Sequence, residues 1–224
     1  MRAAFRDRHE AGRQLAEALA ADPNPQPLVL ALPRGGVLVA APIARRLGAP
    51  LDLLLVRKIG APGQPELAVA AVVEGQPPIT VVDEIACRDT GADGSYLALQ
   101  QAEAVREIER RRRRYREGRF LPELQGRTVI VVDDGVATGT TMRAALRALS
   151  RSDPASVVLA VPVAAADSLS LLAGEADRIV CLHQPTDFRS VGGHYEDFHQ
   201  VDDEEVLNAM ATLSSDRTPG PPTS

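Results

Sequence analysis

Short apolar runs alternate along the chain with segments whose apolar residues recur at helical spacing. Runs of strand length lie at residues 28–32, 51–56, 128–132, 156–163 and 179–182. Amphipathic segments lie at residues 8–21, 37–47, 140–150 and 165–173. Continuous apolar runs are typical of strands that are buried on both faces. The alternation therefore predicts an α/β fold with a mostly parallel, doubly wound sheet.

An insertion interrupts this alternation at about residues 75–125. Shorter apolar runs at 67–73 and 79–82 predict a hairpin-like excursion from the sheet. Residues 93–117 are highly charged but keep a narrow apolar stripe at helical spacing. We therefore expect a long, largely exposed helix within the insertion.

The C-terminal part of the chain loses the regular pattern. Residues 183–200 contain Gly, Pro and several aromatic residues without a fixed period, which predicts a small irregular segment. Residues 201–213 are expected to form a terminal helix, and the Ser-, Thr-, Pro- and Gly-rich residues 214–224 a disordered tail. Residues 1–213 are therefore interpreted as a single domain.

Composition narrows the classes of function. Hydrophobic residues make up 45% of the 224 residues, and the net charge of −5 disfavours nucleic-acid binding. No stretch approaches the roughly 20 apolar residues that span a bilayer, and the N-terminus lacks the apolar run of a signal peptide. Cys87 and Cys181 lie far apart without metal-ligand spacing. We expect reduced thiols in a cytoplasmic protein.

The predicted sheet directs attention to the segments that follow its strands. Ligands of open parallel sheets bind outside the carboxyl ends of the strands. Three expected loops lie at such ends, at residues 33–36, 57–65 and 133–141.

Residues 129–141 carry the most specific pattern. A buried strand is followed by Asp133 and Asp134, and then by a loop of small and hydroxyl residues that opens a helix. Backbone N–H groups at a helix N-terminus bind anions, and Gly139 permits close approach of the backbone. Hydroxyl donors in the loop are Thr138, Thr140 and Thr141. This half of the loop is suited to a phosphate monoester.

The two carboxylates of the same segment need a different partner. They would repel a phosphate, so they face vicinal sugar hydroxyls or a Mg²⁺ ion held by those hydroxyls. A phosphate cradle beside an acidic pair predicts a ribose 5-phosphate site. The alternative is an ordinary strand-turn-helix unit whose acids are solvated.

This segment closely resembles the signature of type I phosphoribosyltransferases. The resemblance implies that Asp133 and Asp134 hold the ribose 2′ and 3′ hydroxyls, with any metal contact made indirectly through these hydroxyls or water. It also implies that the following loop binds the 5-phosphate through Val136, Ala137, Thr138, Gly139, Thr140 and Thr141. Gly135 departs from the pattern, which usually has an aliphatic residue there. A less characterised subgroup shares both the Pro-Arg-Gly-Gly and the Asp-Asp-Gly-Val-Ala-Thr-Gly stretches.

Two further loops agree with the resemblance. Arg34, Gly35 and Gly36 follow the first expected sheet strand and open a helix, so they form a second anion cradle or a plain turn. The family places its pyrophosphate loop here. Arg57 and Lys58 match an Arg-Lys pair of adenine-type members, which implies pyrophosphate contacts. Lys58 is also the only lysine among the 25 basic residues, and a compact ammonium is not equivalent to a guanidinium at a phosphate site.

The implied reaction uses 5-phosphoribosyl-1-pyrophosphate (PRPP) and Mg²⁺. Ribose 5-phosphate would pass to a nitrogenous base, with release of pyrophosphate. Asp133, Asp134, Lys58 and Arg34 would supply positioning and electrostatic stabilisation rather than a covalent nucleophile. Ala137 stands where members that act on 6-oxopurines carry an Asp, which disfavours those bases. Relatives are often dimers, so a homodimer is expected.

A hood formed by residues 183–200 would recognise the base. Phe188 and Tyr195 concentrate there in a chain with only 3% aromatic residues, and they either stack on the base or anchor the segment to the core.

Other functions remain open at this level. The Arg110–Arg114 run is interpreted as a solvated helix face paired with neighbouring glutamates, although it would also serve as a mobile cover or an RNA-binding patch. A PRPP-sensing regulatory or RNA-binding protein on the same fold is the main alternative to an enzyme. A hydrolase that uses water as acceptor is another.

Overall fold

The sheet at the centre of the fold is parallel, as expected. The computed structural model describes residues 3–22 and 25–216, which form a five-stranded sheet in the order β2-β1-β6-β7-β8. Its strands are β1 (Leu28–Ala31), β2 (Leu51–Leu53), β6 (Thr128–Val132), β7 (Ser156–Val163) and β8 (Arg178–His183). The predicted fold class is confirmed.

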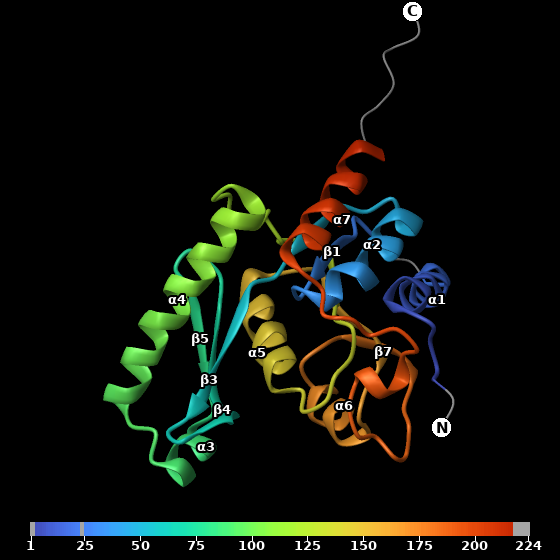
Figure 1. The fold of residues 1–224 in the computed structure, drawn as a ribbon. Helices are drawn as coiled ribbons and strands as arrows, with labels where there is room; N and C mark the ends of the chain where they lie inside the picture. The colour runs from blue at the N-terminus through green and yellow to red at the C-terminus, as the bar shows by residue number, and fades with distance from the viewer. Residues whose placement is uncertain (1–2, 23–24, 217–224) are drawn as a thin grey trace, which may run out of the picture.

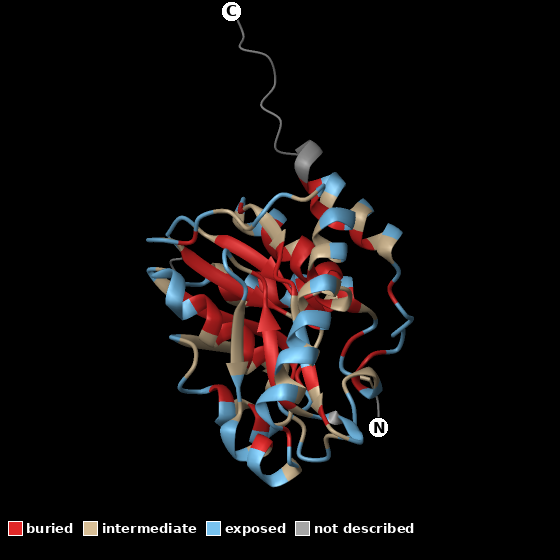
Figure 2. Ribbon diagram, turned by 90° about the vertical axis from the view of Figure 1, so that its left-hand side faces the viewer, coloured by how far each residue is buried: buried red, intermediate tan, exposed pale blue. Residues whose placement is uncertain are grey.

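Alternate residues of each central strand enter two different hydrophobic cores. Val29 and Ile130 belong to one core, with residues of α1 (Arg8–Ala20), α2 (Gly35–Leu47) and α7 (Asp203–Asp216). Leu30 and Val131 belong to the other, with residues of α5 (Thr140–Leu149) and α6 (Ala166–Leu172). Both faces of the sheet are therefore covered, and its strands form the buried centre of the molecule (Figure 2).

A second, antiparallel sheet forms the insertion. Three strands of the described chain pair in the order β3-β4-β5. The elements of the insertion are β3 (Val56–Ala61), β4 (Gln64–Val73), β5 (Ile79–Val82), α3 (Glu84–Thr90) and α4 (Gly94–Arg116). Figure 1 shows α4 and this small sheet as a lobe beside α5. The hairpin-like excursion is thus present, but the separate sheet begins before the expected boundary near residue 75.

The predicted strand at 51–56 is confirmed only for Leu51–Leu53, and the predicted loop at 57–65 is wrong. The chain leaves the parallel sheet after Leu53, and Val56–Ala61 pairs with β4 instead. The pairing is irregular around Gly60, where a Cβ atom would lie 2.4 Å from the backbone oxygen of Pro65. Gly and Pro therefore mark a bulged hairpin here, although their density in the sequence suggested a loop.

A buried ion cluster fixes the end of α4 to both sheets. Arg116 hydrogen-bonds to Glu74 at the end of the small sheet, and its Nε lies 3.4 Å from Asp52 Oδ1 in β2. The Glu74 carboxylate also accepts from the backbone N–H of Leu55, at 2.9 Å. Because removing one partner would leave a buried charge uncompensated, the cluster defines how the lobe meets the sheet.

The hood is joined to the N-terminal segment. Residues 184–202 contain one short 3-10 helix, η2 (Gly192–His194), within otherwise irregular chain. Phe5 forms an isolated bridge with Tyr195, and the N–H of Glu196 donates to Phe5 O at 2.9 Å.

The last helix extends further than expected. Because α7 continues to Asp216, it includes the first part of the predicted tail, while residues 217–224 lie outside the described residues. A further 3-10 turn, η1 (Ser150–Ser152), follows α5. None of the helices in the described part of the chain is long and apolar enough to cross a membrane.

Candidate active site

The acidic pair lies at the carboxyl end of β6, where the parallel sheet directs its ligands. The backbone N–H of Asp134 donates to Asp133 Oδ1 at 2.8 Å, which orients the first carboxylate. Burial raises the pKa of Asp133 well above its usual range, and the adjacent Asp134 charge raises it further. Burial also raises the pKa of Asp134, against the opposing effect of Arg8. Such a buried acidic pair favours a cation or a hydrogen-bond donor as its ligand.

The loop after the acids is held to β7 and α6. The backbone of Val136 bonds to the end of β7 and to the residue before α6. Its N–H donates to Val163 O at 2.9 Å, and its oxygen accepts from the N–H of Ala165 at 3.1 Å. The hydroxyl of Ser168 donates to Ala137 O. Gly139 has a φ of +75° and precedes α5, a conformation that favours glycine. The loop is therefore fixed before any ligand binds.

Three helices that follow strands of the parallel sheet begin without a side-chain cap. None of α2, α5 and the shorter α6 has a capping hydrogen bond from a described side chain at its N-terminus. In contrast, Asp7, Asp83 and Asp93 cap α1, α3 and α4. Uncapped N-terminal N–H groups remain available to an anion. The two predicted anion cradles thus converge on the acidic pair.

Glycine permits the first turn of α2 to lie against the acids. A Cβ atom on Gly35 would lie 2.0 Å from Asp134 Oδ2, and one on Gly36 would lie 2.8 Å from Val132 O. Both positions therefore exclude a larger residue. The peptide bond between Pro33 and Arg34 is cis.

Gly135 has a packing explanation. A Cβ atom there would lie 2.5 Å from Cγ1 of Val191 in the hood and 3.0 Å from Cγ1 of Val163. The hood therefore fills the space that the usual aliphatic side chain would occupy.

Arg57 and Lys58 lie within β3, rather than at the end of a parallel strand. Lys58 pairs with Ala71, which belongs to the core on the α5 side, whereas Arg57 pairs with Val72 of the opposite core. Directly opposed residues share one face of a sheet. The exposed Lys58 is therefore on the α5 side of the small sheet, and the exposed Arg57 is on the other side. The two residues do not act as one pair.

The side chain of Arg34 lies beside Asp203, the first residue of α7. Its Nη1 lies 3.9 Å from Asp203 Oδ1, and Arg114 Nε lies 4.0 Å from Asp203 Oδ2. The hydroxyl of Tyr115 donates to Asp203 Oδ1 at 2.5 Å. Burial raises the pKa of Tyr115 to about 12, with the Asp203 hydrogen bond adding to the shift. One carboxylate therefore connects the predicted pyrophosphate loop with α4.

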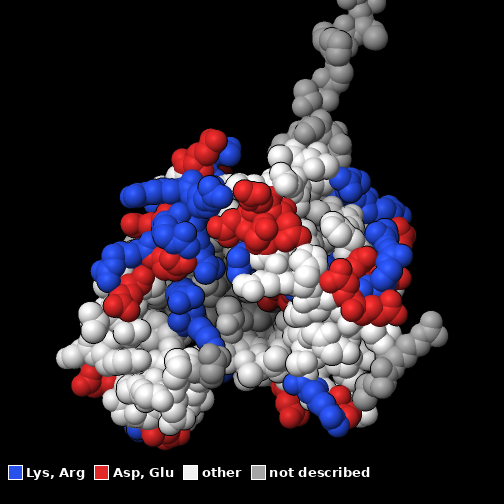
Figure 3. Space-filling model, in the orientation of Figure 1, with Lys and Arg blue, Asp and Glu red and all other residues white. Residues whose placement is uncertain are grey.

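The predicted pairing of the α4 arginine run with neighbouring glutamates holds for Arg110 and Arg111, whereas the Arg112 guanidinium lies 4.0 Å from the ring centroid of Phe120. Arg110 and Arg111 donate to Glu107 at 2.8 and 2.7 Å. These bonds, led by that from Arg110, lower the pKa of Glu107 to about 2. Figure 3 shows the basic surface of this lobe beside an acidic group, with a hollow between the lobe and the rest of the molecule. The acidic residues of the first turn of α7 are Asp203, Glu204 and Glu205.

Arg8 contributes a contact that sequence reasoning missed. This residue is only 6% exposed, and its Nε donates to Asp134 Oδ2 at 2.8 Å. Its Nη1 donates to His199 O at 2.9 Å, and its guanidinium lies 3.8 Å from the ring centroid of Phe198. Arg8 and Asp134 are 126 positions apart in the sequence, so no local sequence pattern indicated their contact.

The hood aromatics divide between two environments. Tyr195 is buried, its ring lies 5.4 Å from that of Phe5, and its hydroxyl donates to Asp134 O at 2.6 Å. These contacts favour the anchoring role for Tyr195 over stacking on a base. Phe188 is half-buried and stacks on His194 with 5.6 Å between ring centroids. It therefore keeps part of its surface accessible.

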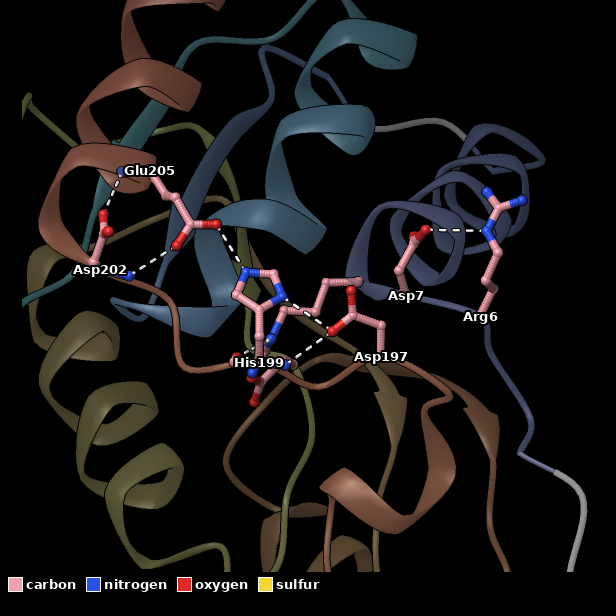
Figure 4. A network of polar contacts seen from close by, with 8 residues as sticks. Arg6, Asp7, Asp197, His199, Asp202 and Glu205 are labelled. Carbon is pink, nitrogen blue, oxygen red and sulfur yellow. Dashed lines mark hydrogen bonds and ion pairs between the residues drawn. The ribbon is translucent and has the colours of Figure 1, made fainter.

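A network of charged side chains joins the end of the hood to α7. His199 lies between Asp197 and Glu205, with Nδ1 at 3.1 Å from the first carboxylate and Nε2 at 2.8 Å from the second (Figure 4). Asp202 and Glu205 cap α7 reciprocally, because each backbone N–H donates to the other residue's carboxylate. The segment therefore runs from His199, which Arg8 links to Asp134, to Asp203 at the start of α7.

Comparison with known proteins assigns the family. A family model described as the phosphoribosyl transferase domain matches residues 5–197. The chain belongs to the phosphoribosyl transferase domain family. This result confirms the predicted family.

Relatives of this phosphoribosyl transferase domain include a solved structure of similar size. TT1426 from Thermus thermophilus is 47% identical and has a TM-score of 0.82, with 95% of this chain and 99% of that chain covered. MT0597 and Rv0571c from Mycobacterium tuberculosis are named as putative phosphoribosyl transferases, and each is 43% identical over 203 residues. The match covers 91% of this chain but 45% of those proteins, so the chain spans about half the length of these relatives.

Proposed function

We propose that this domain transfers ribose 5-phosphate from PRPP to a nitrogenous base, with Mg²⁺ as cofactor and with release of pyrophosphate. The observation that carries the proposal is the convergence of the acidic pair with two uncapped helix N-termini at one edge of the sheet. The acidic pair suits the ribose of PRPP, and the two helix N-termini suit its phosphate groups. The family assignment supports the same reaction class.

The 5-phosphate would bind at the start of α5. Backbone N–H groups of residues 136–141 and the hydroxyls of Thr138, Thr140 and Thr141 would contact its oxygens. The helix dipole adds positive potential there, and the fixed loop keeps the ordering cost low. Asp133 and Asp134 would then accept hydrogen bonds from the ribose hydroxyls beside the phosphate.

Pyrophosphate would bind at the start of α2. The N–H groups of Gly35 and Gly36 and the guanidinium of Arg34 would bind one side of it, and Lys58 would approach from the face of the small sheet toward α5. Arg57 has less support, because it occupies the opposite face. In this arrangement the first turn of α2 and the small sheet both contribute residues to the pyrophosphate site.

The acidic pair also suits Mg²⁺. Carboxylate oxygens are hard ligands, and Mg²⁺ commonly takes one or two of them together with waters and substrate phosphates. Among the described residues, no group of three or more His, Cys, Asp and Glu side chains is placed to hold a metal ion. Asp133 and Asp134 would therefore hold Mg²⁺ together with the donor, through its hydroxyls or water. The bound ion would neutralise charge on the pyrophosphate.

The reaction requires stabilisation of charge rather than a protein nucleophile. The C1–O bond to pyrophosphate breaks as the acceptor nitrogen forms a bond to C1, pyrophosphate leaves with the electron pair, and the N–H proton of the acceptor is released to solvent. Arg34 and Lys58 would stabilise the departing anion, while the acidic pair would stabilise the oxocarbenium-like sugar.

The acceptor would enter between the phosphate loop and the hood. Ala137 offers no carboxylate to handle a purine proton, which disfavours 6-oxopurines. Phe188 supplies the accessible aromatic surface on which a base could stack. The base itself is left open by these residues.

A panel assay tests the proposal directly. Full-length protein, Mg²⁺ and PRPP are incubated with individual nucleobases and related amines, and pyrophosphate release is measured against a reaction without acceptor. Release that depends on one acceptor, with formation of its ribosyl monophosphate, is the expected result.

Two other outcomes would overturn the transfer reaction. Tight PRPP binding without turnover across the panel would indicate a sensor of the donor. Equal pyrophosphate release without any base would indicate hydrolysis, in which water is the acceptor.

A further inference from the structure

Arg8 occupies a place that is unfavourable for a cation on two grounds. It is the first residue of α1, where the positive end of the helix dipole disfavours positive charge. It is also buried, and a buried guanidinium without a partner is strongly destabilising. The contacts of Arg8 must therefore offset both the unfavourable helix dipole and the cost of burial, and they indicate what the residue does.

The contacts of Arg8 join the acidic pair to the end of the hood. Its Nε binds Asp134 Oδ2, and its Nη1 binds the backbone oxygen of His199. Phe198 covers the guanidinium plane. The rigid, planar fork of arginine fits this divided role, whereas the ammonium of lysine would supply a charge without the same geometry.

Asp134 is thereby held at both ends. Arg8 takes Oδ2 of its carboxylate, and the hydroxyl of Tyr195 takes its backbone oxygen. Gly35 leaves space for this carboxylate at the start of α2. Among the described contacts, Oδ1 is the oxygen of this carboxylate that remains available to a ligand.

We propose that Arg8 is a positioning residue of the sugar site, which holds the Asp134 carboxylate in place for the ribose and couples it to the hood. This role rests on the proposed function. Arg8 acts through Asp134 and does not itself contact the donor.

The divided contacts of Arg8 distinguish a positioning role from a structural one. Its guanidinium bonds at once to the Asp134 carboxylate and to the backbone oxygen of His199. A residue that only stabilised the fold would change the melting temperature without changing the affinity for PRPP.

Two substitutions separate charge from geometry. Arg8→Gln removes the cation, and Arg8→Lys keeps the charge but loses the fork. Arg6→Gln is the matched control, because it removes an exposed arginine of the same segment that binds Asp7 instead of Asp134. Affinity of the folded proteins for PRPP in Mg²⁺ is measured by calorimetry near neutral pH, and their melting temperatures are measured alongside.

Arg8→Gln should weaken PRPP binding by on the order of tenfold near neutral pH, equivalent to about 1.4 kcal/mol. Arg8→Lys should recover only part of the affinity, because it keeps the charge but loses the planar fork. Arg6→Gln should match the wild-type protein.

Two results would overturn the role of Arg8 in different ways. If Arg8→Gln only lowers the melting temperature, while its PRPP affinity matches the wild-type value, Arg8 is structural and the proposed transfer reaction survives. If the wild-type protein does not bind PRPP at all, the proposed function fails and the positioning role fails with it.

Discussion

The hydroxyl of Tyr195 donates a 2.6 Å hydrogen bond to the backbone oxygen of Asp134. This bond connects the hood with the loop that carries the acidic pair. The segment from Tyr195 to Asp203 then continues over the same edge of the sheet, where it meets Arg8 and Arg34. The hood therefore supports the segment that carries the acidic pair.

Tyr195→Phe tests this support by removing one hydroxyl while keeping the ring packed on Phe5. The buried oxygen of Asp134 would lose its donor, so the free energy of unfolding should fall by about 1–3 kcal/mol, as measured by urea denaturation. PRPP affinity should also fall. Tyr96→Phe is the control, because it removes a similar 2.8 Å bond to Gly60 O in the insertion. Equal PRPP affinity in the two variants would contradict the connection.

Gly35→Ala tests the close approach of α2 to the acids. The new Cβ atom would lie 2.0 Å from Asp134 Oδ2 and must displace that carboxylate or the helix. We expect loss of PRPP binding by calorimetry, with the fold retained by circular dichroism. Gly94→Ala is a suitable control, since no heavy atom outside its immediate neighbours lies within 4 Å of the added Cβ atom. Wild-type affinity in Gly35→Ala would show that the close approach has no role in binding.

Asp203→Asn tests whether the carboxylate beside Arg34 competes with an anion. Asp203 lies near both Arg34 and Arg114, so its neutralisation should leave more positive potential for pyrophosphate. Because these contacts are partly exposed, we expect tighter pyrophosphate binding by at most about fivefold, or roughly 1 kcal/mol. Glu204→Gln removes a neighbouring exposed charge as the control. Weaker pyrophosphate binding in Asp203→Asn would instead mean that Asp203 orients Arg34 productively.

The pH dependence of stability should depend on His199. Hydrogen bonds with Glu205 and Asp197 raise the pKa of His199 above 6.5 in the folded protein. A raised folded pKa means that this stabilisation is complete below pH 6.5 and disappears as pH rises through the folded value. Melting temperature measured from about pH 6 to 8.5 should therefore show a decline that His199→Gln reduces. An equal decline in melting temperature for the wild-type protein and His199→Gln would show that His199 does not cause it.

Sequence reasoning located the parts of the site that are contiguous in the chain. The strand, Asp133, Asp134 and the following loop form one uninterrupted segment, so residue type and order were sufficient. The alternation of buried strands and helices likewise predicted the parallel sheet. Local pattern and tertiary structure agree in these regions.

The remaining parts depend on contacts between distant segments. Arg8 resembles any other arginine in an Arg-rich chain until the fold places it against Asp134. Lys58 was assigned to the end of a parallel strand because the density of Gly and Pro after it suggested a loop, whereas it lies within β3, which pairs with β4 in the antiparallel sheet. Tyr195 stood out as an aromatic residue, but its buried position follows from packing against Phe5.

The central claim is that the acidic pair binds the sugar of PRPP while the adjacent loop binds its phosphate. Calorimetry with PRPP and Mg²⁺ tests it most directly, using Asp133→Asn, Asp134→Asn and the exposed-site control Asp89→Asn. We predict that each variant of the pair loses at least about tenfold in affinity, or about 1.4 kcal/mol, while the control binds like the wild-type protein. Unchanged PRPP affinity in both variants of the pair would contradict the claim.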